Sequence, residues 1–205
     1  MTQQTEQPSS TARPVRRVDR PGLSRQVCLP GGQAVTLRPI RPDDEEAELD
    51  FVHRLSPDSR YLRFMAPIKD VTPAMLERLT HIDLDKEMAL VAVASTAEGE
   101  RQVGVARYSI LEDARSCEFA IVVDDLWRGT GLARELMTSL LDIARHYHGL
   151  EAMEGVAFAD NQRMLGLAHS MGFRNMPDPE DRSLVRMRRR LRSPAESSAP
   201  STLPG

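Results

Sequence analysis

The amino-acid sequence predicts a mixed α+β fold, and two observations carry that prediction. Three apolar segments, Met88–Ala94, Val103–Leu111 and Ser116–Val123, follow one another through short polar links that suit hairpin turns. Apolar residues then recur at intervals of three and four over Leu132–Ala144, which indicates a long amphipathic helix, before Ala152–Phe158 has the composition of a strand again. This order of strand, helix and strand favours a crossover connection beside the antiparallel strands.

The elements before these strands are predicted from the capping and turn residues at their ends as well as from their apolar residues. The β-branched run Ala34–Arg38 lies between two glycines and a proline, which predicts a strand. Asp43 and Asp44 place negative charge in the first turn of a helix that an apolar stripe extends to Leu55. Thr72, followed by a proline, predicts an N-cap and the start of another helix.

The last predicted elements are a helix and a strand. Residues Asn161–Met171 carry an apolar face, and Gly172 follows as the expected C-cap. Val185–Leu191 alternates apolar residues with arginines, which predicts a half-exposed strand. The arginines there could bind nucleic acid or an acidic partner, or form a solvated strand face, and no aromatic side chains interleave to stack on bases. The arginine cluster comprises Arg182, Arg186, Arg188, Arg189, Arg190 and Arg192.

Length, charge and cysteine content exclude several classes of protein. The 205 residues fit one domain, which we expect to span residues 30–192, with disordered tails at 1–29 and 193–205. A net charge of −3 gives no reason to expect nucleic-acid or membrane-surface binding, and no apolar run reaches the roughly 18–20 residues that cross a bilayer. Cys28 and Cys117 form neither a disulfide scaffold nor a zinc site. The polar run Met1–Gln7 predicts no secretory signal, so we expect a cytoplasmic protein, and we expect no metal.

The segment Arg128-Gly129-Thr130-Gly131 is the most informative, because it joins the end of a strand to the start of the long helix. A helix N-terminus exposes unpaired amide groups, glycines let an anion approach the backbone, and Arg128 adds a charged donor. The segment therefore suits a phosphate group, although an ordinary tight turn could have the same sequence. It is not a P-loop, since no Lys-Ser or Lys-Thr follows the glycines, nor a G-x-G-x-x-G fingerprint, since Arg134 occupies the last position.

The run Arg128–Ala133 resembles the R/Q-x-x-G-x-G/A motif of the GNAT family of acyl-CoA N-acyltransferases. Asn161 and the later Gly172-Phe173 are similar to that family's helix-to-strand segment. The order of elements also resembles the GNAT fold, a mostly antiparallel twisted sheet flanked by helices. Within the family, the chain is similar to the acetyltransferase domain of Pat-type bacterial protein lysine acetyltransferases. The segments that carry this closer resemblance are Leu37–Asp44, Ser59–Phe64, Ile82–Val91 and Asn161–Met164.

The resemblance implies acetyl-CoA as co-substrate and assigns residues to its binding. Backbone groups at the end of the strand would pair with the pantetheine arm, the glycine loop would hold the pyrophosphate, and Asn161 would bond the cofactor arm. Asn161 could instead cap its helix, a role for which Asp160 competes. The implied cofactor-binding residues are Ile121, Val122, Val123, Arg128, Gly129, Thr130, Gly131, Leu132, Ala133 and Asn161.

Glu118 is the candidate general base, because the resemblance assigns that role to this glutamate. It lies in an otherwise apolar strand, where partial desolvation would strengthen it as a proton acceptor. The strand alone favours a Glu118 that faces outward into solvent, and the resemblance favours the base. Many GNAT enzymes carry a general-acid tyrosine seven residues after the Asn161 position, but Ala168 stands there in this chain, and His169 would point about 100° away. The sequence therefore names no general acid.

The acceptor that the resemblance implies is a lysine side chain of a protein, with central metabolic enzymes such as acyl-CoA synthetases as candidates. Two alternatives stay open: N-acetylation of a small amine or amino acid, and a CoA-binding regulatory module without catalysis. Asp83, Asp85 and Glu87 could present acidity to a lysine-bearing substrate or lie in a solvated loop. Arg60 and Arg63 could contact CoA or substrate, or be helix-surface charges.

Overall fold

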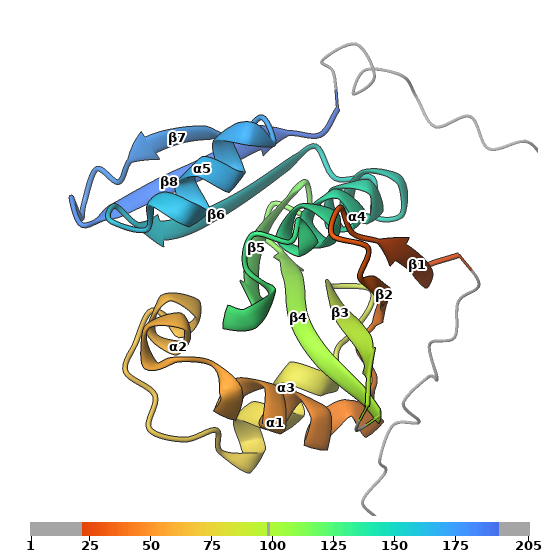
Figure 1. Cartoon of the computed structure of the whole chain (residues 1–205). Coiled ribbons are helices and arrows are strands. Elements are labelled where there is room, and N and C mark those ends of the chain that lie inside the picture. The colour runs from red at the N-terminus through yellow and green to blue at the C-terminus, as the bar shows by residue number, and fades with distance from the viewer. Residues whose placement is uncertain (1–21, 98, 193–205) are drawn as a thin grey trace, which may run out of the picture.

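The computed structural model describes residues 22–97 and 99–192, and the predicted disorder of residues 1–21 and 193–205 lies outside the described residues. The described residues form an eight-stranded sheet in the order β1-β2-β3-β4-β5-β6-β8-β7, with helices on both faces (Figure 1). Neighbouring strands are antiparallel except β5 and β6, which are parallel and joined through α4. The predicted mixed α/β fold is confirmed.

The elements that the sequence predicted are all present, whereas β1, α2 and β7 have no counterpart in the prediction. The strands are β1 (Arg25–Cys28), β2 (Ala34–Pro39), β3 (Glu87–Thr96), β4 (Gly99–Ile110), β5 (Ser116–Val123), β6 (Ala152–Phe158), β7 (Arg174–Pro177) and β8 (Leu184–Arg190). The helices are α1 (Glu45–Arg54), α2 (Pro57–Phe64), α3 (Pro73–Thr80), α4 (Leu132–His146) and α5 (Gln162–Ser170), with 3₁₀ turns η1 (Pro42–Asp44) and η2 (Asp125–Trp127).

The sheet separates two apolar cores. Alternate residues of β3 point to opposite faces, so that Leu90 joins the core formed with α4 and α5, while Val91 joins the core formed with α1 and α3. Leu136 and Leu140, on the apolar stripe of α4, are fully buried in the first core. Phe51 of α1 is fully buried in the second. Helices α1–α3 therefore cover one face of the sheet, and α4 and α5 cover the other.

Strands β5 and β6 pair over a short ladder and then separate. The ladder joins Ser116–Glu118 to residues 152–154, although both strands continue beyond it. The ring of Phe119 fills the point of divergence, where Gly155 of β6 has no side chain: a Cβ atom on Gly155 would lie 2.6 Å from Phe119 Cε1. Phe173 packs on the same ring, with centroids 5.2 Å apart. The sheet consequently opens beyond Glu118.

The prediction of a disordered tail is wrong for residues 25–29, because they form β1 and the start of its turn. The local sequence gives a weak strand signal, since Val27 is the only buried residue of β1, and the pairing with β2 depends on backbone groups. Arg25 adds side-chain bonds to α4, donating to Glu135 Oε2 at 2.9 Å and to Ser139 Oγ at 2.8 Å. These partners lie more than a hundred residues away in the chain, so a local pattern cannot reveal them.

Candidate active site

A cleft of about 770 Å³ opens where β5 and β6 separate. Its walls come from the far part of β5, the loop between η2 and α4, the first turn of α4, the start of α5 and the last turns of α2. Most of the lining is apolar, with the charged side chains of Glu118, Arg63 and Arg128 among it. The cleft therefore brings together segments that are separated by about half the chain.

The unpaired edge of β5 supplies backbone groups to the cleft. On one side, β5 pairs with β4 as far as Val123. On the other side, the ladder with β6 ends at Glu118, so that Ile121, Val122 and Val123 line the cleft along an edge that no strand in the described residues pairs with. Such an edge can pair with an extended ligand that contains amide groups. The structure thus places these three predicted residues in the cleft.

Two glycines shape the loop that leads into α4. Gly131 is the N-cap of α4 with a φ of 92°, and Gly129 has a φ of 75°, a backbone region that residues with a side chain disfavour. A Cβ atom on Gly131 would also lie 3.3 Å from Pro30 Cδ. Both glycines line the cleft together with Leu132 and Ala133, where α4 begins. The first amides of a helix lack intrahelical partners, so this end of the cleft suits a phosphate group.

Thr130 supports the loop instead of lining the cleft. Its Oγ1 donates a hydrogen bond to the carbonyl of Trp127 at 2.7 Å and accepts one from the amide of Leu132 at 3.4 Å. The hydroxyl therefore fixes the turn between η2 and α4. A direct contact between Thr130 and the pyrophosphate stays a prediction.

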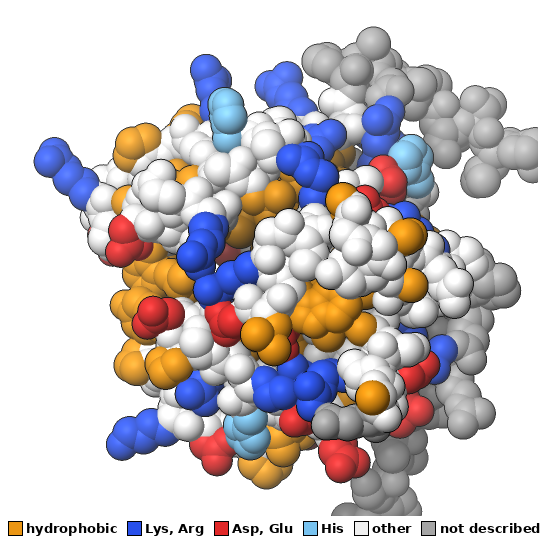
Figure 2. Space-filling model, in the orientation of Figure 1, with side chains coloured by type: hydrophobic (Ala, Val, Ile, Leu, Met, Phe, Trp, Pro, Cys, Tyr) orange, Lys and Arg blue, Asp and Glu red, His pale blue; other side chains and the backbone are white. Residues whose placement is uncertain are grey.

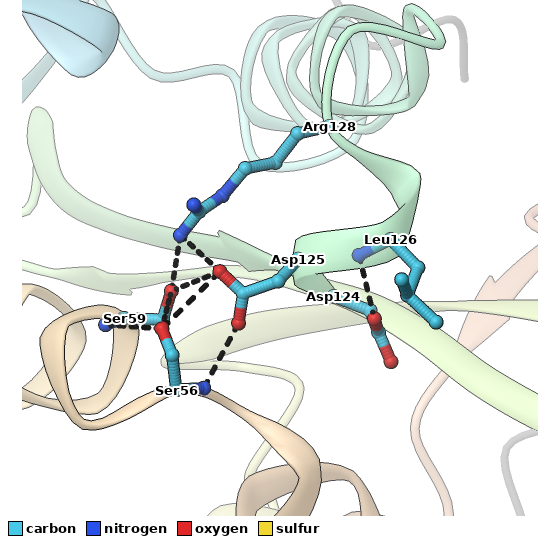
Figure 3. A network of polar contacts seen from close by, with 6 residues as sticks. All are labelled: Ser56, Ser59, Asp124, Asp125, Leu126 and Arg128. Atoms are coloured by element: carbon cyan, nitrogen blue, oxygen red, sulfur yellow. Dashed lines mark hydrogen bonds and ion pairs between the residues drawn. The ribbon is translucent and has the colours of Figure 1, made fainter.

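Arg128 reaches from the loop toward α2 (Figure 3). Its guanidinium pairs with Asp125 and donates a hydrogen bond to Ser59 Oγ. Asp125 in turn accepts hydrogen bonds from Ser59 Oγ at 2.8 Å and from the amide of Ser56 at 2.9 Å. Burial acts to raise the pKa of Asp125, but the hydrogen bonds to its carboxylate and the charge of Arg128 outweigh burial and hold the pKa below its usual value. A contact between Arg128 and phosphate would therefore require an exchange of partners.

Asn161 caps α5, which was one of the two roles expected for it. Its Oδ1 accepts a hydrogen bond from the amide of Met164 at 3.2 Å, and the residue also lines the cleft. Asp160 is exposed and does not act as the cap. Further along α5, Ala168 is buried and His169 is exposed, and neither lines the cleft. These two positions therefore bring no proton donor to the cleft.

Glu118 lies on the sheet face that carries α1–α3. The strand register places it beside Ser109 of β4 on one side and Glu154 of β6 on the other. Its neighbours Cys117 and Phe119 are buried on the opposite face, whereas Glu118 lines the cleft and is exposed. The expected partial desolvation of Glu118 is therefore wrong, because the carboxylate stands where the sheet opens. A substrate that enters the cleft would meet it there.

Helix α2 forms one wall of the cleft and was missed from the sequence. The signal for it is present, because Ser56 caps the helix by accepting a hydrogen bond from the amide of Ser59 at 3.2 Å, and Pro57 occupies the first helical position. The same Ser/Thr-Pro pattern predicts α3 correctly. The cleft-lining residues of α2 and its C-cap are Ser59, Leu62, Arg63 and Met65.

Three observations on the described residues concern metals, membranes and thiols. No helix there has both the length and the apolar content to cross a bilayer. No group of three or more His, Cys, Asp or Glu side chains in residues 22–97 and 99–192 is placed to hold a metal ion. Cys28 and Cys117 are both free thiols, and burial raises the pKa of the Cys117 thiol to about 12.

A sheet that splits beside a glycine-shaped helix N-terminus is the architecture of acyl-CoA-dependent N-acyltransferases. The family model of the acetyltransferase (GNAT) domain matches residues 34–174, and the chain belongs to this family. It is 38% identical over 157 residues to acetyltransferase PA5475 of Pseudomonas aeruginosa, covering 77% of this chain and 84% of that protein. It is 26% identical over 144 residues to acetyltransferase Pat of Mycolicibacterium smegmatis, covering 69% of this chain but only 41% of that protein.

Solved structures give the same fold. The GNAT domain of S. lividans PAT has a TM-score of 0.76 at 24% identity, over 83% of this chain and 98% of that one. A spermidine N-acetyltransferase from Vibrio cholerae, solved with CoA and spermine, has a TM-score of 0.61 at 21% identity, over 77% of this chain and 95% of that one. The chain is thus a GNAT-family N-acetyltransferase, and the fold is that of proteins that bind CoA.

Proposed function

We propose that the chain transfers the acetyl group of acetyl-CoA to lysine side chains of proteins. The cleft between β5 and β6 carries this proposal, because one continuous space joins a helix N-terminus, an unpaired strand edge and the carboxylate of Glu118. The similarity to acetyltransferase Pat, together with the Pat-type sequence segments, supports a protein as the acceptor. A cytoplasmic location is part of the proposal, and the two free thiols are consistent with a reducing compartment.

The residues that line the cleft fit acetyl-CoA, which when bound supplies an activated acetyl thioester. The edge of β5 at Ile121–Val123 pairs with the amides of the pantetheine arm. The amides of Gly131 and the first turn of α4 bind the pyrophosphate, and Arg128 joins them when it exchanges Asp125 for phosphate. Asn161 keeps its Oδ1 on the α5 cap and offers its Nδ2 to the cofactor arm. An amide of the β5 edge also polarises the thioester carbonyl.

Glu118 accepts the proton that the attacking lysine must lose. A lysine ammonium has an ordinary pKa near 10.4, so it is protonated at neutral pH and cannot attack a carbonyl until the proton leaves. Glu118 lines the cleft and is exposed, so its carboxylate can take up the proton and release it to solvent. A positioned base of this kind contributes about 10²–10⁴-fold to a rate. The side chain of Ala168 donates no proton to the departing sulfur.

The mouth of the cleft supports a protein acceptor over a small amine. Tyr61 of α2 is 44% exposed and Met65 is 36% exposed, a high exposure for large apolar side chains. Tyr61 stacks on Phe158 of β6 with ring centroids 5.1 Å apart, so that the apolar surface extends across from α2 to β6. Figure 2 shows hydrophobic side chains at the left of the molecule, between the part that holds β6–β8 and the part that holds α2. Such a rim suits contact with a protein surface.

The test is acetylation of a cell lysate from a strain that lacks the protein. Purified protein and acetyl-CoA are added, and new acetyl-lysines are mapped by mass spectrometry. We expect a few sites that depend on the wild-type protein and are absent with Glu118→Gln, while Glu154→Gln, the neighbouring carboxylate in the register, keeps them. The Glu118→Gln sample also corrects for non-enzymatic acetylation. No enzyme-dependent site, with CoA binding intact, would overturn the protein acceptor in favour of a small amine or a non-catalytic module.

A further inference from the structure

A second cavity, of about 390 Å³, lies on the same sheet face as Glu118. It is open to one side and is lined by α2, α3, His81 and the facing side chains of β3 and β4. Its charged lining is unbalanced, because three arginines contribute and Glu87 is the only acidic residue among the described lining residues. The arginines are Arg63, Arg78 and Arg107.

Arg63 connects the two cavities, because it lines both the second cavity and the main cleft. Its guanidinium lies near the ring of Phe64, 5.1 Å from the centroid. Within residues 22–97 and 99–192, no hydrogen bond or ion pair joins this guanidinium to another side chain. Burial, together with the nearby charge of Arg107, lowers the pKa of Arg63 to about 10. Arg63 is partly buried, and a cation in such a position without a bonded side-chain partner suits an anion that binds beside it.

The acidic groups around the cavity offset the charge of Arg63 only in part, through Glu48. Glu87 lies 3.5 Å from Arg107 and so neutralises that arginine instead. The predicted use of Glu87 to attract a lysine-bearing substrate therefore conflicts with this pairing. Glu48 is buried, and its Oε2 accepts a hydrogen bond from Gln102 Nε2 at 2.5 Å. Burial raises the pKa of Glu48, which weakens it as a counter-charge.

The register of the sheet places this cavity beside the proposed base. Ser109, which lines the second cavity, stands directly opposite Glu118 in the β4–β5 ladder. Glu87 stands opposite Ser109 in the β3–β4 ladder, so the three side chains form a row on one face. An amine that reaches Glu118 from this face therefore has the rest of its molecule next to the arginines.

We propose that the acceptor carries a carboxylate close to its reactive amine, and that Arg63 and Arg78 bind this carboxylate in the second cavity. The inference rests on the proposed acetyl transfer at Glu118 and names the chemistry of its acceptor. In a protein, the carboxylate comes from an aspartate or glutamate beside the target lysine. In a free amino acid, it is the α-carboxylate. Polyamines, which carry only positive charge, are repelled by the same arginines.

Two lysine peptides that differ only in charge test this proposal. One has glutamate on both sides of the lysine, and the other has glutamine there. We expect wild-type protein to prefer the acidic peptide by about tenfold in kcat/KM, because a guanidinium–carboxylate bond is charge-assisted. Arg78→Gln should reduce that preference to about twofold or less, since Arg78 lines only the second cavity and not the CoA cleft. Arg182→Gln, an exposed arginine outside both cavities, is the matched control and should keep the preference.

Further outcomes distinguish a peptide carboxylate from that of a free amino acid, and failure of the carboxylate site from failure of the proposed acetyl transfer. Acetylation of free amino acids but of neither peptide, with the same dependence on Arg78, would support the carboxylate site and overturn the protein acceptor of the proposed function. Equal kcat/KM for both peptides, unchanged by Arg78→Gln, would overturn the carboxylate site and leave the acetyl transfer intact. Calorimetric titration of the two peptides into protein saturated with CoA requires no turnover, and equal affinities there would overturn the inference even without detectable acetylation. Efficient acetylation of spermidine would also contradict it.

Discussion

The two cavities that meet at Arg63 are built in different ways. The main cleft is shaped by the path of the backbone: a ladder that ends at Glu118, a strand edge without a partner and glycines in left-handed conformations. The second cavity is shaped by long side chains from α2, α3, β3 and β4. One substitution of an arginine can remove much of the positive charge of the second cavity without moving the backbone, whereas the shape of the cleft cannot change unless the backbone changes. We therefore expect changes at the glycines that shape the cleft to affect stability and CoA binding together, and changes at Arg78, which lines only the second cavity, to affect acceptor choice.

Glu118→Gln should have the largest effect of these variants, and it separates catalysis from CoA binding. Glu118 lines the cleft on the sheet face that holds the second cavity. We expect kcat to fall by about 10²–10⁴-fold, the range for loss of a general base. The Kd for CoA should stay unchanged, since the side chain is not among the groups that hold the cofactor. Steady-state kinetics and calorimetry measure the two quantities. Glu154→Gln should keep wild-type kinetics, and a Glu118→Gln variant with undiminished kcat would show that Glu118 is not the base.

Gly155→Val tests whether the opening of the sheet is a property of the fold. The new side chain would collide with the ring of Phe119, because even a Cβ atom would lie 2.6 Å from it. We expect a loss of about 1–3 kcal/mol in the free energy of unfolding, the usual cost of overpacking, together with weaker CoA binding. Chemical denaturation and calorimetry check both. Gly166→Ala is the control: that helical glycine faces open space, so alanine should stabilise the protein by up to about 1 kcal/mol.

Gly131→Ala should have a smaller effect on stability. Alanine in the left-handed region costs about 1–2 kcal/mol, and its Cβ would also press on Pro30. Because Gly131 lines the cleft at the start of α4, CoA affinity should fall as well. Gly149→Ala is the control, because it places alanine in the same left-handed backbone region, with a φ of 67°, at a position that does not line the cleft. If both variants weakened CoA binding equally, the loop geometry would have no specific role.

Asp125→Asn should have the smallest effect, because the pair that it breaks is partly exposed. We expect a loss of less than about 1 kcal/mol near neutral pH. The pKa of Asp125 is lowered in the folded protein, so the stabilisation is present above the unfolded-state pKa of about 3.9 and is lost as the pH falls through the lower folded-state value. Denaturation curves of wild type and variant should therefore converge in acid. A difference that persisted there would show that the carboxylate charge is not the cause.

The cleft could be predicted from the sequence to a greater extent than the second cavity, for a physical reason. Glycine positions and the change of period at residue 132 are local signals, and they located the loop and the strand that line the cleft. Burial is not local, so Glu118 was expected to be desolvated and is exposed. Arg128 was expected at the phosphate, but in the structure it contacts Asp125 and Ser59. Ser59 lies 69 residues away in the sequence, so a local pattern could not reveal this contact.

The second cavity had no local signal at all. Arg63, Arg78 and Arg107 come from three different elements, and each alone is an ordinary charge on a helix or strand. Only the packing of α2 and α3 on the sheet brings them together. The start of helix α2 has a local signal, an N-cap serine followed by proline at Ser56-Pro57, so the helix could have been predicted from the sequence.

Strand β1 has a practical consequence for anyone who trims or tags this protein. The turn after β1 places Pro30 against Gly131, and Arg25 holds α4 through Glu135 and Ser139. Strand β1 and its turn therefore support the cofactor loop and α4 through contacts that lie outside the cleft. A shortened protein that begins at residue 30 would keep every residue of the cleft lining, yet its loop would be released from one side. We expect such a protein to lose affinity for CoA before it loses its fold.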